Sequence, residues 1–197
     1  MDLKQHLKNA VVYFRWLPLL LLVGCAGITP DKSVLQGIDG IACVGQIAQP
    51  PEGIVAEEDK SLLDESLGST GEGKLCAGKT FVATKPVKVY RVWNSEKDYT
   101  QYGRWWSFQI PHGPKQQYRE ENVICPSWSS LDRMSECTLK PGTKLVVGPG
   151  QGANCLSSSY PKSAVNQVFV PNDSRKDILY VENCTPGVVW PLRQEHE

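Results

Sequence analysis

The pattern of hydrophobic and polar positions predicts a sheet-rich domain in the C-terminal part of the chain. Short runs of β-branched and aromatic residues are bounded by proline, glycine and asparagine, and one of them partly alternates apolar with polar residues, as half-buried strands do. These runs predict strands at 81–84, 87–93, 105–110, 143–147, 167–170 and 178–181. A turn at 171–174 would join the last two strands as a hairpin. Good helix formers predict a helix at 115–124. Because strands outweigh helices, we expect an α+β fold with a twisted, mainly antiparallel sheet and one or two short helices.

The first residues have a different pattern, which is typical of a targeting signal. Lys4, Lys8 and Arg15 give a basic start, and an apolar run follows at 16–23. That run is too short to span a bilayer, which needs about 20 apolar residues. Pro18 also interrupts it as a helix. A basic segment followed by a short apolar one predicts a secretory signal rather than a transmembrane helix.

The apolar run ends in Leu22-Val23-Gly24-Cys25, which resembles the lipobox of bacterial lipoproteins. The resemblance implies cleavage before Cys25, a signal peptide at 1–24, and diacylglycerol on the cysteine sulfur as a membrane anchor. Ala26 in place of aspartate implies sorting to the outer membrane, facing either the periplasm or the cell surface. The alternative is an ordinary signal peptide with a chance cysteine.

The segment after this cysteine is expected to be a tether. Residues 26–42 carry no strong pattern, and 49–74 are rich in proline, glycine, serine and acidic residues. A short, solvated helix or loop is expected at 57–67. We therefore expect residues 25–75 to form a lipidated tether with an acidic low-complexity segment, and residues 76–197 to form the compact domain.

Six further cysteines indicate disulfide bonds, since an even number in an exported chain is typical of an oxidising compartment. Pairing of neighbours is the least committed of the many connectivities: Cys43–Cys76, Cys125–Cys137 and Cys155–Cys184. No cysteines have the short spacing of structural zinc sites. After the signal peptide only His112 and His196 remain, so no metal site is expected. The formal net charge is zero, which gives no general affinity for nucleic acid.

Two motifs that suggest enzymes are incomplete. His112 stands in a Pro/Gly loop without the Gly-x-Ser-x-Gly elbow that a serine hydrolase would need. The loop 148–152 is glycine-rich and follows a predicted strand, but no Gly-Lys-Ser/Thr follows it. We interpret the histidine as a surface residue and the loop as a tight turn.

A more informative set of residues is spread over several elements. Arg91 lies inside a predicted strand. A buried charge there is costly unless it is paired or faces a ligand. Trp105 and Trp106 begin another strand, Arg119 follows on the predicted helix, and Gln167 opens a late strand. Arginines bind pyrophosphate as bidentate donors, and aromatic rings stack on nicotinamide or adenine. Each residue also has a simple structural role, as a surface arginine, a core tryptophan or an edge glutamine.

The order of these motifs resembles bacterial ADP-ribosyltransferase-like toxin domains, above all the NAD glycohydrolases of the tuberculosis necrotizing toxin type. The resemblance covers about 80–172 and includes Gly103, Ser107, Gly142-Thr143 and the loop 148–152. It implies NAD as a substrate, no other cofactor, and cleavage of the nicotinamide–ribose bond. The sequence departs from the family where Ser163-Ala164-Val165 replaces a Gly-Gly before the glutamine, and the transferases' Glu-x-Glu pair is absent.

The resemblance also implies roles for individual residues. Gln167 and Arg91 would be catalytic, with Gln167 holding the ribose or positioning water. Arg91 and Arg119 would hold the pyrophosphate. Trp105 or Trp106 would pack the nicotinamide, with Ser107 bonding nearby.

Two function hypotheses therefore remain open. One is an NAD-consuming, toxin-like enzyme, which the residue pattern favours. The other is a non-enzymatic envelope lipoprotein that binds a protein or small-molecule partner, which is favoured because NAD is expected to be scarce outside the cytoplasm. The first hypothesis predicts that Arg91, Ser107, Arg119 and Gln167 line one cleft. It fails if Arg91 and Gln167 lie on opposite faces of the sheet.

Overall fold

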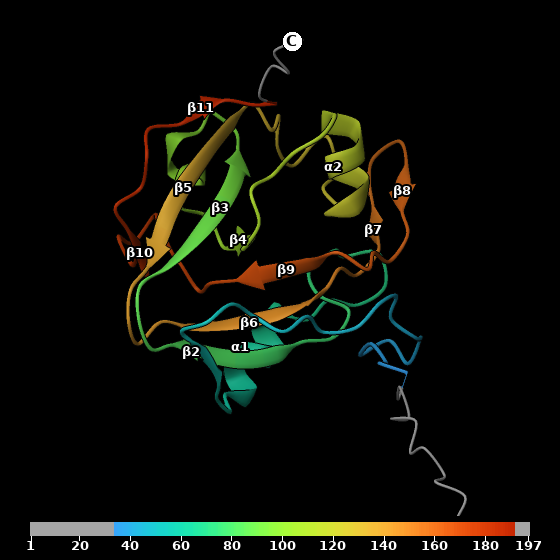
Figure 1. Cartoon of the computed structure of the whole chain (residues 1–197). Helices are drawn as coiled ribbons and strands as arrows, with labels where there is room; N and C mark the ends of the chain where they lie inside the picture. Colours follow the sequence, from blue (N-terminus) through green and yellow to red (C-terminus); the bar gives the residue numbers. More distant parts are fainter. Residues whose placement is uncertain (1–33, 192–197) are drawn as a thin grey trace, which may run out of the picture. The chain divides into compact units, whose positions relative to one another are not determined.

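Two antiparallel sheets organise the chain in the computed structural model, which describes residues 34–191 (Figure 1). The five-stranded sheet has the order β1 (Ile54–Ala56), β2 (Lys79–Ala83), β6 (Lys144–Pro149), β9 (Asn166–Phe169) and β4 (Trp105–Trp106). In the four-stranded sheet, β5 (Arg133–Leu139) pairs with β3 (Val87–Trp93), β10 (Val181–Glu182) and β11 (Val188–Val189). A small third sheet joins β7 (Ala153–Asn154) to β8 (Ser159–Tyr160). The helices are α1 (Lys60–Ser66), the 3₁₀ helix η1 (Asp98–Tyr102) and α2 (Lys115–Glu121). The fold is thus the disulfide-stapled α+β domain that the sequence predicted.

The main core lies between the two sheets. Alternate residues of each strand point into it, as the two-residue repeat of a strand requires. Phe81 and Leu145 enter from the five-stranded sheet, and Val89 and Leu139 enter from the four-stranded sheet. This shared core fixes one sheet against the other.

Helix α1 covers the opposite face of the five-stranded sheet. Its N-cap is Asp59, whose carboxylate accepts a 3.0 Å hydrogen bond from the backbone N–H of Leu62, as N-cap residues do. Leu62 then packs against Val146 and Phe169 on that face. The helix expected within 57–67 is therefore present, but it is packed on the sheet rather than solvated.

The start of the compact domain at residue 76 was predicted wrongly. Residues 34–75 belong to the same compact unit as the rest of the described chain. They supply α1 and the strand β1, which pairs with β2, and a disulfide joins Cys43 to Cys76. The prolines, glycines and acids of this stretch interrupt its apolar residues, so that they show no clear period, although Ile54 reaches the main core. The predicted signal peptide and Cys25 lie outside the described residues.

Most predicted strands are present, with changes at their ends. The strand expected at 105–110 is only the two residues of β4. The last two predicted strands do not form a hairpin, because β9 and β10 belong to different sheets. Between them, Asp173 and Ile178 form an isolated antiparallel bridge. Strand β5 was not predicted, because polar residues interrupt its apolar pattern.

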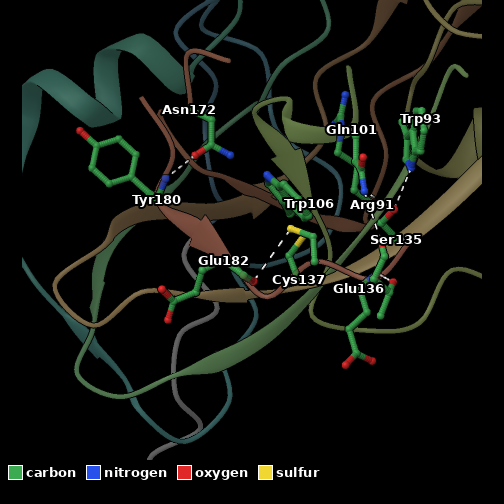
Figure 2. The surroundings of a disulfide bond; sticks show 12 residues. Arg91, Trp93, Gln101, Trp106, Ser135, Glu136, Cys137, Asn172, Tyr180 and Glu182 are labelled. Atoms are coloured by element: carbon green, nitrogen blue, oxygen red, sulfur yellow. Dashed lines mark hydrogen bonds between the residues drawn. A yellow bond between two sulfur atoms is a disulfide. The ribbon is translucent and has the colours of Figure 1, made fainter. Parts of the chain in front are cut away.

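Six cysteines form three disulfides within residues 34–191. Cys43–Cys76 is as predicted. The other two pairs were predicted wrongly, since the structure joins Cys125 to Cys155 and Cys137 to Cys184. Strand β5 carries Cys137 into the main core (Figure 2), where the segment after β10 reaches it. None of the helices in this described part is long and apolar enough to cross a membrane.

Candidate functional site

A cavity of about 300 Å³ lies where β3, β4 and β9 approach α2 and the loop after it. We call it the aromatic cleft, because its lining includes Trp105, Trp106, Tyr118 and Trp128. Arg91 and Gln167 also line it. Small-molecule sites commonly combine such an apolar lining with a few polar groups. The sequence-predicted pair Arg91 and Gln167 therefore shares one cleft.

Arg91 is held under β4 by backbone carbonyl groups. Its Nε donates to the Thr100 oxygen at 2.7 Å, and its Nη1 donates to the Trp105 oxygen at 2.6 Å. No carboxylate in residues 34–191 forms an ion pair with it. Burial lowers the pKa of Arg91 to about 10, so the side chain stays charged at neutral pH. The cleft is lined by a cation without a protein counter-ion, which is costly to keep without a ligand.

One nitrogen of Arg91 remains available. Its Nε and Nη1 form the two hydrogen bonds above, and Nη2 forms none with the described residues. In this part of the chain, no fully buried side-chain nitrogen or oxygen lacks a hydrogen-bond partner. The Nη2 of Arg91 must therefore be accessible, and it can donate to an anionic or carbonyl group of a ligand.

Glycine at position 103 makes this position of Arg91 possible. A Cβ atom at Gly103 would collide with the Arg91 guanidinium. The backbone of Gly103 is extended, with φ of −68° and ψ of −171°, so any residue could adopt it. The glycine is needed here because of the close approach and not because of its conformational freedom.

The two tryptophans of β4 point to opposite faces of the five-stranded sheet, as neighbours in a strand do. Trp106 is buried in the main core, and its Nε1 donates to the Gly103 oxygen at 2.8 Å. Trp105 packs on Phe169 with ring centroids 5.0 Å apart. Both line the aromatic cleft, and Trp105 is the less buried of the two.

Gln167 connects the cleft to the end of α2. It lies in β9 opposite Gly148 of β6. Its Nε2 donates to the Asn122 oxygen at 3.0 Å, and only 7% of the residue is exposed. Its Oε1 accepts no hydrogen bond within residues 34–191. Because no fully buried side-chain oxygen in this part lacks a partner, the Oε1 is accessible too. Gln167 thus offers an acceptor to the cleft while its amide nitrogen fixes α2.

Arg119 and Ser107 do not reach the aromatic cleft, so their predicted contacts with NAD are not supported by their positions. Arg119 is buried and donates to backbone carbonyls of the 124–130 loop, with the shortest bond, 2.7 Å, to Ser129. It holds that loop in place. The Oγ of Ser107 accepts from the Gln109 N–H at 3.0 Å, and the Ser107 backbone pairs with Tyr90.

Two other residues of α2 and its end face the cleft instead. Tyr118 and Asn122 both line it, because residues four apart share one face of a helix. Burial raises the pKa of Tyr118 to about 12, although the nearby positive charge of Arg91 opposes the rise. The 3.6-residue repeat was the available signal, since it places Tyr118 rather than Arg119 on the face of Asn122.

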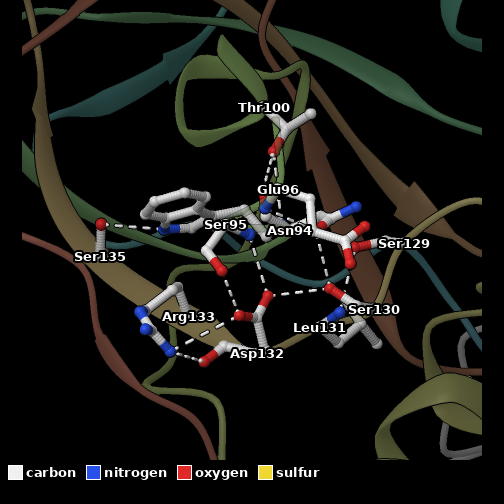
Figure 3. Close-up of polar contacts among 11 residues, drawn as sticks. Asn94, Ser95, Glu96, Thr100, Ser129, Ser130, Leu131, Asp132, Arg133 and Ser135 are labelled. Atoms are coloured by element: carbon white, nitrogen blue, oxygen red, sulfur yellow. Dashed lines mark hydrogen bonds and ion pairs between the residues drawn. The ribbon is translucent and has the colours of Figure 1, made fainter. Parts of the chain in front are cut away.

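A polar cluster around Asp132 supports the 3₁₀ helix that carries Thr100 (Figure 3). The Asp132 carboxylate accepts hydrogen bonds from the Ser95 N–H at 2.9 Å, from the Ser95 hydroxyl and from the Ser130 hydroxyl at 2.8 Å. Burial opposes ionisation, but these hydrogen bonds and the charge of Arg133 lower the pKa of Asp132 to about 2. The cluster therefore joins the loop after β3, which carries Ser95, to the loop before β5, which carries Ser130.

Comparison with protein-family models, curated proteins and solved structures found no match to this chain. Within the part of the chain that the structure describes, no group of three or more histidine, cysteine or acidic side chains is arranged to hold a metal ion.

Proposed function

We propose that the protein is a lipid-anchored cell-envelope protein that binds NAD in the aromatic cleft and cleaves its nicotinamide–ribose bond. The observation that carries this proposal is the shared lining of Arg91, Trp105, Trp106 and Gln167. These residues come from three strands, and the family resemblance implies a contact with NAD for each of them. The membrane anchor rests on Cys25 and its lipobox-like context.

The tryptophan rings and the Gln167 amide of the cleft suit two steps of this reaction. The nicotinamide ring of NAD is cationic, and tryptophan faces attract flat cations. Trp105 would stack on this ring. Cleavage develops positive charge on the ribose, as in other glycosidic reactions. The accessible Oε1 of Gln167 would accept a hydrogen bond from a ribose hydroxyl or from the attacking water. Catalysis would then come from positioning rather than from a strong base.

The size of the cleft limits which part of the ligand enters it. A volume of about 300 Å³ lies at the lower end of small-molecule sites. It is suited to the nicotinamide and its ribose, so the remainder of a dinucleotide would lie outside.

A second candidate function is non-enzymatic binding of a small-molecule or protein partner. It is favoured by the lining of the aromatic cleft, which includes no carboxylate and no histidine from residues 34–191. Catalysis without a carboxylate or a histidine would rest on the positioning of the reactants by Gln167. In this case the same tryptophans and Arg91 would bind a ring-containing anion without changing it.

An assay of nicotinamide release separates the two functions. The full chain, purified with its disulfides intact, is incubated with NAD, and free nicotinamide is quantified by chromatography. The Gln167→Ala variant should lower kcat by about a hundredfold, as removal of a transition-state hydrogen bond does. Gln116→Ala is the matched control, because Gln116 is exposed on α2 and bonds only to Glu120 in the described structure.

The outcomes point to different conclusions. Nicotinamide release that depends on Gln167 but not on Gln116 would support the hydrolase. Saturable NAD binding without release would favour the binding protein. If the wild type neither binds NAD nor releases nicotinamide, both proposals for NAD are rejected.

A further inference from the structure

A second cavity, of about 260 Å³, lies next to η1 and the loop after β9. Three arginines, Arg91, Arg104 and Arg175, line it together with Tyr99. We call it the arginine groove. Arg91 lines both this groove and the aromatic cleft, so one guanidinium belongs to both cavities.

Each arginine of the groove has donor nitrogens that form no hydrogen bond with the described residues. Arg104 donates from Nε to the Asn172 oxygen at 3.1 Å and from Nη1 to Glu65 at 2.7 Å. Arg175 donates from Nη2 to the Tyr99 hydroxyl at 3.2 Å, and its guanidinium lies 4.9 Å from the centre of that ring. The remaining guanidinium nitrogens, including Nη2 of Arg91, form no hydrogen bonds within residues 34–191. Planar guanidinium groups with free donors match the geometry of phosphate oxygens.

The charges around the groove favour an anion. Asp173 is an acidic residue of its lining, and Lys176 neutralises it at 3.1 Å. Glu65 neutralises Arg104 in part, through an ion pair in which both side chains are 44% exposed. The hydrogen bond from Arg175, with the charges of Arg175 and Lys97, lowers the pKa of Tyr99. After these pairings, the charges of Arg91 and Arg175 remain without an acidic partner in the described part.

We infer that the arginine groove binds the phosphate or diphosphate group of a nucleotide whose ring occupies the aromatic cleft. This inference rests on the proposed function and assigns the substrate's anionic part to Arg104 and Arg175 rather than to Arg119. The groove receives the part of the ligand that the cleft is too small to hold. Arg91 is the shared residue. Its Nη2 lies against Gly103, which itself lines the groove.

Titration calorimetry with inorganic pyrophosphate tests the groove without any turnover. The full chain should bind pyrophosphate, and the affinity should fall as salt is added. Arg175→Gln should weaken binding about tenfold, the loss expected for one charge-assisted hydrogen bond. Arg104→Gln should do the same, but it also breaks the pair with Glu65. Arg175→Gln is therefore the cleaner variant, because its side chain is exposed. Lys85→Gln is the control, since Lys85 is exposed, pairs with Glu52 and does not line the groove.

A second arm identifies the ligand as a nucleotide. NAD should compete with pyrophosphate and bind more tightly, because its ring adds contacts in the aromatic cleft. Trp105→Ala should lower the affinity for NAD much more than the affinity for pyrophosphate. Equal affinity of the wild type for NAD and pyrophosphate would restrict the site to simple phosphates and overturn the nucleotide assignment.

Failure of the inference and failure of the proposed function give different results. Pyrophosphate binding that depends on Arg175, without nicotinamide release, supports the groove and rejects the hydrolase. Nicotinamide release with a KM unchanged in both Arg104→Gln and Arg175→Gln supports the hydrolase and rejects the groove. Absence of pyrophosphate binding by the wild type also rejects the groove.

Discussion

Arg91 on β3 donates a 2.6 Å hydrogen bond to the backbone oxygen of Trp105 on β4 and thereby ties the four-stranded sheet to the five-stranded sheet. A second bond, to Thr100, ties the same guanidinium to η1. The cation that lines both cavities is thus also a structural link. Its buried charge is costly, and the two carbonyl bonds offset part of that cost while one nitrogen stays available.

The first prediction concerns this double role. Arg91→Lys keeps the charge but replaces a planar fork with a single ammonium, which cannot bond to Thr100 and Trp105 in the same geometry. We expect the free energy of unfolding to fall by about 1–3 kcal/mol, since a buried carbonyl loses its partner. Urea unfolding measures the change. Arg133→Lys is the control, because Arg133 is partly exposed at the start of β5. An Arg91→Lys variant as stable as the wild type would show that these bonds contribute little.

The second prediction uses the contact between Gly103 and Arg91. Gly103→Ala should displace the guanidinium and cost about 1–3 kcal/mol of stability, as overpacking does. The same change should cost much less in an Arg91→Ala background, because the colliding group is gone. A double-mutant cycle of unfolding free energies measures this coupling. Additive effects of the two substitutions would contradict the contact.

The third prediction concerns the disulfide between Cys137 and Cys184. It links β5 to the segment after β10 and lies in the main core beside Trp106. Replacing both cysteines with alanine should lower the free energy of unfolding by about 2–5 kcal/mol, the usual effect of losing a native disulfide. Peptide mapping under non-reducing conditions gives an independent check. Peptides joining Cys125 to Cys137 would contradict the observed pairing.

How far the sequence predicts this fold depends on the element. Strand β3 was predicted to its exact ends, because it is rich in β-branched and aromatic residues and a proline precedes it. Strand β5 was missed although it is the centre of its sheet. Its Ser135 and Glu136 break the apolar pattern, because Ser135 accepts hydrogen bonds from Trp93 and Gln101 inside the structure and Glu136 pairs with Lys88 on the outer face. Such tertiary partners are invisible in a local pattern.

The candidate site shows the same limit. Arg91 was recognised because a charge inside a strand needs a partner or a ligand. Gln167 was recognised through the family resemblance, since it begins a late strand. Arg119 was predicted to hold the pyrophosphate, yet its position on α2 turns it toward the 124–130 loop. The arginine groove was not predicted, since Arg104 and Arg175 are 71 positions apart in the numbering and only the fold joins them.

The fourth prediction concerns the membrane anchor. If Cys25 carries diacylglycerol, cells grown with labelled palmitate should incorporate the label into the protein. Cys25→Ser should abolish both the labelling and the association with membranes, because the acyl chains supply most of the binding energy. Cys43→Ala with Cys76→Ala serves as the control, since it removes cysteines that are disulfide-bonded in the domain. Label retained by Cys25→Ser would place the lipid on another residue, and absence of label in the wild type would reject lipidation.

The last prediction concerns acid stability and Asp132. Its pKa in the folded protein is about 2, below the ordinary value of 3.8, because hydrogen bonds from Ser95 and Ser130 and the charge of Arg133 outweigh the effect of burial. A group with a lowered pKa stabilises the fold above its unfolded pKa, and this contribution is lost as the pH falls toward the folded pKa. Asp132→Asn should therefore lower the free energy of unfolding at neutral pH by about 1.5–3 kcal/mol, the range for hydrogen bonds to a charged group.

The difference between Asp132→Asn and the wild type should shrink as the pH is lowered from 3.8 to about 2, because the wild-type carboxylate then becomes neutral as well. Urea unfolding at a series of pH values measures both curves. Asp98→Asn is the control, since Asp98 is exposed on η1. This variant should have the same unfolding free energies as the wild type. Because the Asp132 cluster holds the loops that carry Thr100 and Ser130, the loss of stability should be accompanied by weaker ligand binding at Arg91. A constant difference across this pH range would mean that Asp132 stabilises the fold through its shape and not through its charge.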